Sequence, residues 1–139
     1  MKINIGRVLL GGLVAGVILN IGEIVLNDIV LKKQMEDWLV SRNVRAAGGT
    51  FVAVAVGLTF LLGIALVWLY AMIRPRFGPG PKTAVVSALV AWFMICVYAG
   101  IIYGLIFEAP LNLLIIGFGW GLVEYIVGAL GGAWLYKEA

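Results

Sequence analysis

Histidine is absent from this chain, cysteine occurs once, and charged residues make up only 12% of it. Without histidine the chain lacks the commonest general base, the commonest zinc ligand and the usual axial ligand of haem. Cys96 cannot form an intrachain disulfide, and its apolar neighbours favour an inert thiol. The two serines, Ser41 and Ser87, belong to no catalytic motif. We therefore expect no enzyme, no metal site and no cofactor.

Apolar residues dominate instead, because 63% of the chain is hydrophobic and its mean hydropathy is +1.10. That composition leaves too little polar surface to solvate a globular protein. Four long apolar runs lie at residues 8–31, 50–73, 84–107 and 111–136. As a helix, each run is roughly 36 to 39 Å long, which exceeds the ~30 Å hydrocarbon core of a bilayer. The sequence predicts an all-α polytopic membrane protein, a bundle of four transmembrane helices with short loops in one integral membrane domain, 1–139.

Lysine and arginine lie mainly at the ends of these runs. At these positions they set the membrane topology and contact lipid headgroups, so we expect no binding of nucleic acid. Four spans place both termini and the second connection on one side of the bilayer. Six basic residues lie on that side: Lys2, Arg7, Arg74, Arg76, Lys82 and Lys137. Four lie on the other side: Lys32, Lys33, Arg42 and Arg45. The positive-inside rule then predicts that both termini are cytoplasmic.

Proline and glycine mark the two short connections. The second connection contains Pro75, Gly78, Pro79, Gly80 and Pro81. Because proline lacks an amide donor and restricts the residue before it, we expect neither flanking helix to continue into this turn. Residues 108–110 form an even shorter outer turn, in which Pro110 suits the first turn of the last helix. Short links predict that the second span packs beside the third and the third beside the fourth.

The first connection is longer and amphipathic. Met35, Trp38 and Leu39 fall on one side of a possible helical turn whose other side carries Glu36, Asp37 and Arg42. This pattern predicts an interfacial helix along the outer headgroups. Its apolar side serves either to anchor the helix by packing or to dock a partner.

Small and polar residues share one face of the first span and one face of the last. The first face carries Gly12, Gly16, Asn20, Glu23 and Asn27, and the last carries Gly117, Gly121, Glu124 and Gly128. In lipid, small residues allow helix backbones to approach closely, and polar side chains need partners because water is absent. We expect the five glycines to be packing positions, facing inward or toward another subunit.

The two intramembrane carboxylates, Glu23 and Glu124, are the candidate functional residues. An acidic side chain near the bilayer centre costs roughly 2.5 to 3.5 kcal/mol on insertion scales. Counting from the outer helix ends places Glu23 about 12 Å deep and Glu124 about 20 Å deep, so we expect no direct pair. The same count predicts Asn20 as the partner of Glu124, and Tyr98 and Thr59 as partners of Glu23. This cluster is either a hydrogen-bond network that fixes packing register or a proton- or cation-binding site.

Four segments also carry a family resemblance: 6–12, 20–23, 68–81 and 119–124. Together they resemble a family of small bacterial four-span integral membrane proteins with no assigned function. The resemblance implies the fold and a bacterial inner-membrane location, and it implies no activity. In size, span number and first-helix glutamate the chain is also similar to small multidrug exporters. It departs from them in its long charged first connection and in Glu124, so their binding role does not transfer to Glu23.

Two functions from different classes follow. The first is a small noncatalytic membrane protein that acts through helix packing, as a homo-oligomer or as an accessory subunit of a membrane complex. The alternative is a small proton- or cation-coupled carrier that uses Glu23 and Glu124. A less favoured reading is a pigment or quinone contact at Trp92, Trp120 and Tyr125. The expected partners are the lipid bilayer and either the protein itself or other membrane subunits.

Overall fold

The structure, a computed structural model, describes residues 2–45 and 48–138, which form helices and no strands. The elements are α1 (Ile5–Val25), η1 (Leu26–Val30), α2 (Lys32–Ser41), α3 (Gly49–Phe77), α4 (Pro81–Trp92), η2 (Phe93–Tyr98), α5 (Ala99–Ile106) and α6 (Leu111–Leu135). The segments η1 and η2 are π-helical continuations of α1 and α4. Four continuous helical rods result, Ile5–Val30, Gly49–Phe77, Pro81–Ile106 and Leu111–Leu135, each long and apolar enough to cross a membrane. The predicted all-α four-helix architecture is confirmed.

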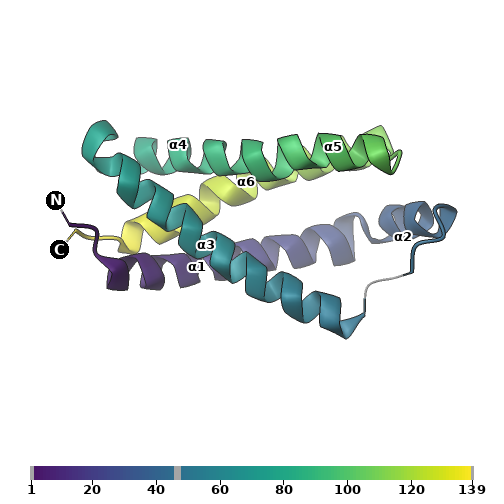
Figure 1. Cartoon of the computed structure of the whole chain (residues 1–139), viewed down its shortest axis with the longest axis horizontal. Helices are drawn as coiled ribbons and strands as arrows, with labels where there is room; N and C mark the ends of the chain where they lie inside the picture. The colour runs from purple at the N-terminus through teal and green to yellow at the C-terminus, as the bar shows by residue number, and fades with distance from the viewer. Residues whose placement is uncertain (1, 46–47, 139) are drawn as a thin grey trace.

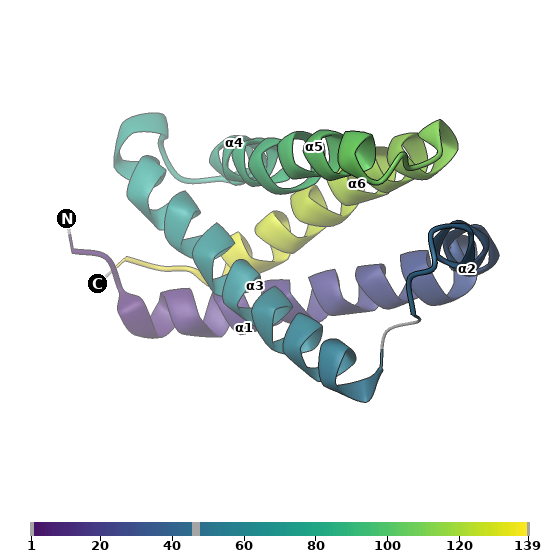
Figure 2. The ribbon, with the colours of Figure 1, turned by 45° about the vertical axis from the view of Figure 1, so that its right-hand side comes forward.

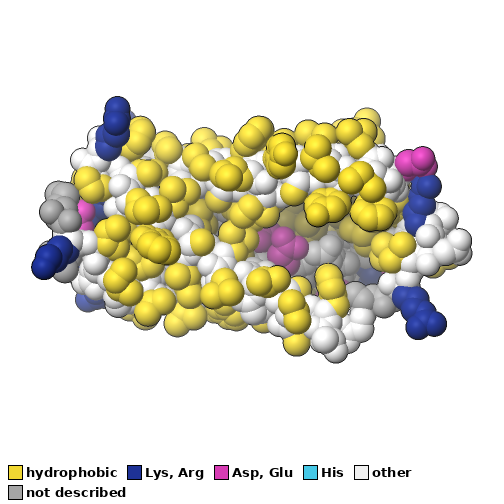
Figure 3. Space-filling model, viewed as in Figure 1, with side chains coloured by type: hydrophobic (Ala, Val, Ile, Leu, Met, Phe, Trp, Pro, Cys, Tyr) yellow, Lys and Arg dark blue, Asp and Glu magenta, His cyan; other side chains and the backbone are white. Residues whose placement is uncertain are grey.

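The four rods run antiparallel, so both termini and the α3–α4 turn lie at one end and α2 and the α5–α6 turn lie at the other (Figure 1). Helix α1 packs against α3 and α6, and α4 packs against the same two helices. The packing of α3 beside α4 and of α4 beside α6 agrees with the short predicted links. Charged side chains gather at the two ends, and the flank between them is almost wholly apolar (Figure 3).

Glycine determines how α1 crosses α3. A Cβ on Gly63 of α3 would lie 2.4 Å from the Gly16 amide nitrogen of α1, and a Cβ on Gly12 would lie 2.5 Å from the Ile64 Cα. The two backbones are therefore in direct contact, which no larger residue permits. From this crossing α3 runs obliquely, and its outer half diverges from the other helices (Figures 1 and 2). Gly12 and Gly16 are packing positions as predicted, and here they pack within one chain.

A second close contact joins α1 to α6. A Cβ on Gly11 would lie 2.5 Å from the Gly132 carbonyl oxygen, and one on Gly128 would lie 3.3 Å from the Leu19 side chain. The sequence analysis identified Gly128 and missed the pair formed by Gly11 and Gly132. The resulting core is rich in small side chains, with Ala15, Ala84, Ala88 and Ala129 almost fully buried.

Aromatic and charged side chains join the chain ends to the α3–α4 turn. The rings of Tyr70 and Tyr136 meet edge to face with centroids 5.9 Å apart, and the Gly80 amide donates to the Tyr70 hydroxyl at 3.2 Å. Arg74 pairs with Glu138 at 3.0 Å, and its guanidinium lies 5.5 Å from the centre of the Tyr136 ring. These contacts hold the C-terminal segment against the end of α3.

The end of α3 corrects one expectation. Pro75 was predicted to lie in the turn, but α3 continues through it to Phe77. Because Pro75 has no amide hydrogen, the Ala71 carbonyl one turn earlier loses its helical hydrogen bond, and the helix continues for only two residues beyond Pro75. The Gly78 amide then donates to the Arg74 carbonyl at 2.8 Å, and Gly78 ends the helix with φ of 82°. Pro81 begins α4, where its missing amide hydrogen has no helical partner to lose.

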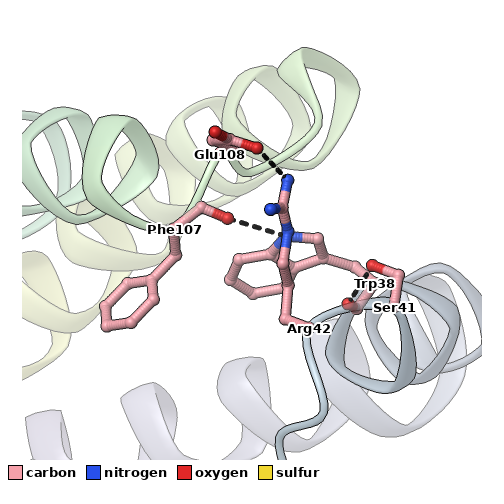
Figure 4. A network of polar contacts seen from close by, with 5 residues as sticks. All are labelled: Trp38, Ser41, Arg42, Phe107 and Glu108. Carbon is pink, nitrogen blue, oxygen red and sulfur yellow. Dashed lines mark hydrogen bonds and ion pairs between the residues drawn. The ribbon is translucent and has the colours of Figure 1, made fainter.

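The amphipathic connection forms α2, which lies across the outer end of the bundle (Figure 1). Met35, Trp38 and Leu39 are half-buried, whereas the other α2 side chains are exposed, so the predicted apolar side is correct. The Trp38 indole donates to the Phe107 carbonyl at 3.3 Å, and Arg42 forms an ion pair with Glu108 (Figure 4). The α5–α6 turn of the same chain therefore contacts α2 at Trp38 and at Arg42, which follows the helix.

The α1–α3 crossing yields a test with a matched control. Gly63→Ala should lower the free energy of unfolding by about 1–3 kcal/mol, because the new methyl group has no room between two backbones. Gly57→Ala, on the same helix with no atom within 4 Å of its Cβ position, should leave stability unchanged or slightly raised. Denaturant unfolding in detergent, followed by circular dichroism, measures both. Equal losses in the two variants would contradict the crossing.

Candidate functional site

Among the residues that the structure describes, Glu124 on α6 is the one acidic residue that is buried, with 6% of its surface exposed. Its carboxyl group lies against α1 at Gly22, where an added Cβ would come within 2.6 Å of the Glu124 Cδ. Two other polar side chains are buried, and both are satisfied: Thr83 donates to the Gly78 carbonyl at 2.6 Å and Ser87 to the Ala84 carbonyl at 2.8 Å. Among residues 2–45 and 48–138, neither Glu124 oxygen has a hydrogen-bond partner.

The level of Glu124 follows from the α1–α6 register. The Trp120 indole, one helical turn before Glu124, donates to the Gly22 carbonyl at 3.2 Å. Since Glu124 itself packs on Gly22, it lies at the level of Glu23, close enough for the two charges to interact. The residue count therefore placed Glu124 too far from the level of Glu23. The two carboxyl groups nevertheless form no direct pair, as expected, because neither Glu124 oxygen has a hydrogen-bond partner among the described residues. Side chains lean toward the N-terminus of their own helix, so in antiparallel helices these two lean toward each other, which a count of residues ignores.

Glu23 has a different environment from Glu124. It is exposed, and one of its carboxylate oxygens accepts a hydrogen bond from the Asn27 side chain at 2.8 Å. The same Asn27 amide also donates to the Glu23 carbonyl at 2.9 Å. Figure 3 shows acidic atoms in a hollow about midway along the otherwise apolar flank. The protein thus holds one carboxyl group at a helix interface and another that is open to its surroundings.

The other predicted members of the cluster do not join it. The Asn20 amide donates to the Gly16 carbonyl at 2.8 Å, and the Thr59 hydroxyl donates to the Ala55 carbonyl at 2.9 Å. Polar side chains within helices can satisfy themselves in this way on the preceding turn. Tyr98 is 63% exposed. Thr59 also belongs to the half of α3 that diverges from the bundle, which the residue count along each helix could not reveal.

The glycines predicted on α6 have three different environments. A Cβ on Gly121 would lie 3.0 Å from the Cys96 sulfur, so this position packs against η2. Gly128 packs against α1, as described above. Gly117 has no atom within 4 Å of its Cβ position, so it makes no close packing contact within the described parts of the chain.

A groove of about 520 Å³ runs between α1 and α6 beside Glu124, and we call it the α1–α6 groove. Gly22 and Glu124 line it together with apolar or aromatic side chains: Ile18, Ile21 and Val25 of α1, and Trp120, Val123 and Val127 of α6. Its volume is within the range of sites that hold small organic ligands. Ile21 and Val123 are 57% and 63% exposed, so the groove opens sideways toward the lipid.

The sequence pattern did not indicate Gly22 as a site residue, and it indicated Trp120 only as a possible pigment or quinone contact. Gly22 precedes Glu23 in the sequence and is not on the polar face assigned to the first span. The sequence therefore did not indicate that the absence of a side chain at Gly22 makes room for one from another helix. A usable signal did exist, because Trp120 precedes Glu124 by one helical turn and an indole donor in lipid needs an acceptor. Which carbonyl accepts it depends on the tertiary register.

The chemistry available at this site is that of carboxyl groups. Within the described ranges, no group of three or more His, Cys, Asp or Glu side chains could hold a metal ion. A lone carboxyl group in apolar surroundings can exchange a proton or hold one cationic group.

No family model, curated protein or solved structure matches this chain. The fold defines only a class, an all-α bundle of four helices that are each long and apolar enough to cross a membrane.

The unpartnered carboxyl group predicts an unusual effect on stability. Glu124→Met keeps an unbranched side chain of similar length and removes two unsatisfied oxygens, so it should raise the free energy of unfolding by about 1–3 kcal/mol. Glu23→Met, which removes the acceptor of the Asn27 amide, should not stabilise the protein. Unfolding in detergent measures both variants. A loss of stability in Glu124→Met would show that the carboxyl group has a stabilising partner and would refute this account.

Proposed function

We propose that this protein is a small noncatalytic integral membrane protein that acts by assembling with other helices, as a homo-oligomer or as an accessory subunit of a membrane complex. The supporting observation is the open flank on which Glu23 lies exposed within the first membrane-crossing helix. A polar side chain facing lipid at this depth is costly, and a helix from another subunit that covers it would remove the cost.

The packing of α3 supports the same proposal. The outer half of α3 diverges from the bundle, and Phe51, Val54 and Leu58 on it are 64%, 56% and 59% exposed. Exposure to lipid alone is ordinary for apolar side chains. Here it accompanies an exposed carboxylate on the adjoining helix, so the surface formed by Glu23 and the outer half of α3 is the proposed assembly surface.

The proposal includes a cellular setting. Membership in the small bacterial four-span family that the sequence resembles would place the protein in the bacterial inner membrane, with lipid and other membrane subunits as its partners. The end that holds both termini and the α3–α4 turn carries more basic residues than the other end, which supports cytoplasmic termini. A protease or tag accessibility assay on each terminus tests this orientation.

A second candidate function is a small proton- or cation-coupled carrier. It is favoured by the two carboxyl groups that lie close enough to interact, one at the α1–α6 groove and one on the exposed flank. Residues that exchange protons or cations between two openings need this kind of proximity.

Assembly is tested by mass and by cross-linking. Gentle extraction from the native membrane should yield a particle heavier than one chain, either a homo-oligomer or a complex with other subunits in fixed ratio. In a Cys96→Ser background, Leu58→Cys on the proposed assembly surface should cross-link, either to itself or to a copurifying subunit, whereas Val123→Cys at the α1–α6 groove should not. A monomeric particle with neither cross-link would reject the proposal. Cross-linking at Val123→Cys alone would move the interface to the groove.

The carrier function is tested by flux. In proteoliposomes with an internal pH indicator and an imposed pH gradient, the wild type should show proton-coupled flux of a monovalent cation. Glu23→Gln or Glu124→Gln should abolish that flux while leaving the folded particle intact, because an amide cannot exchange a proton at this site. Equal flux in the wild type and in both variants would eliminate the carrier.

A further inference from the structure

We infer that the α1–α6 groove binds an amphiphilic amine, with its nitrogen at the Glu124 carboxyl group and its apolar body along the groove. This binding requires neither assembly nor flux, so it stands or falls separately from both candidate functions. Three observations carry it: the unpartnered carboxyl group, the apolar walls, and the opening toward lipid.

The carboxyl group specifies the polar end of the ligand. Only 6% of the Glu124 surface is exposed, and neither of its carboxyl oxygens has a hydrogen-bond partner in residues 2–45 and 48–138. The Trp120 indole beside it already donates to the Gly22 carbonyl. No lysine or arginine occurs in α6, and the one in α1, Arg7, lies four turns from Gly22 along that helix. Neither of the two helices that form the groove therefore supplies a basic group at the level of Glu124.

The walls specify the rest of the ligand. Besides Glu124 and the indole, the side chains that line the groove are aliphatic. They offer no second hydrogen-bonding group for a sugar, a zwitterion or a hydrated metal ion. A molecule with a single basic group and an apolar body satisfies both the acid and the walls.

Access and proton balance favour an amine over a quaternary cation. The ligand enters sideways from the bilayer past Ile21 and Val123, which a neutral amine does more readily than a charged one. The Glu124 side chain rotates from beneath Gly22 toward the groove, and its O–H bond breaks as the amine lone pair takes the proton and a new N–H bond forms. The resulting ammonium donates hydrogen bonds to both carboxylate oxygens. A quaternary ammonium has no N–H donor and cannot form them.

The test is equilibrium dialysis of radiolabelled n-octylamine against the full chain in phosphatidylcholine nanodiscs, with empty nanodiscs subtracted. The wild type should bind saturably at about one amine per chain, as the single carboxyl site implies. Glu124→Gln should weaken this binding at least about tenfold, because the amide cannot supply a proton or an ionic hydrogen bond. Glu108→Gln, at the exposed α5–α6 turn, should leave it unchanged. Octan-1-ol should show no dependence on Glu124.

Two further measurements locate the ligand. Val123→Trp, at an exposed position where a larger side chain does not disturb the core, should block the groove and reduce binding as much as Glu124→Gln does. In protein labelled with 5-fluorotryptophan, the amine should shift the ¹⁹F resonance of Trp120, which is assigned by its loss in Trp120→Phe. The inference is overturned by wild-type binding that does not exceed empty nanodiscs, by equal binding in Glu124→Gln, or by an equal loss of binding in Glu108→Gln.

Discussion

Direct backbone contact between helices is the constraint on which this structure depends. Inside a bilayer there is no hydrophobic force between helices, so close packing and hydrogen bonds must hold the bundle. Gly12, Gly16 and Gly63 bring α1 against α3, and Gly11 and Gly132 bring α1 against α6. The first contact makes α3 cross obliquely and leaves its outer half apart. The second fixes the register that places Glu124 against α1.

The ends of the bundle are joined by polar contacts, because water and headgroups are available there. At one end Tyr70, Tyr136 and Arg74 hold the C-terminal segment against the α3–α4 turn. At the other end Trp38 and Arg42 of the α2 segment contact the α5–α6 turn. The exposed ion pair of Arg42 with Glu108 adds little by itself, roughly 0 to 1 kcal/mol. The polar and aromatic contacts together set which loops meet, while the glycine crossings set the helix tilts.

Between these ends, the two carboxyl groups lower the stability of the fold. Natural proteins often keep destabilising polar residues at functional positions. Replacing such residues raises stability but reduces function. In the part of the chain that the structure describes, Glu124 has no hydrogen-bond partner at its helix interface, and Glu23 accepts a side-chain hydrogen bond only from Asn27. Their different surroundings divide the proposed roles: the exposed Glu23 flank suits contact with another helix, and the Glu124 groove suits a small basic ligand.

The sequence by itself determined the number of helices, the position of both termini at one end of the bundle, the amphipathic α2 and the two short turns. These features depend on local composition, on the spacing of apolar residues, and on the backbone conformations that proline and glycine allow. It also singled out Glu23 and Glu124, since a charge in an apolar run is visible without a structure. Only the tertiary structure decided which residues meet. Asn20 and Thr59 bonded to their own helices, and Gly22 received Glu124. Helix tilt and side-chain lean set these contacts, and both arise from packing between distant segments, which no residue count along a single helix contains.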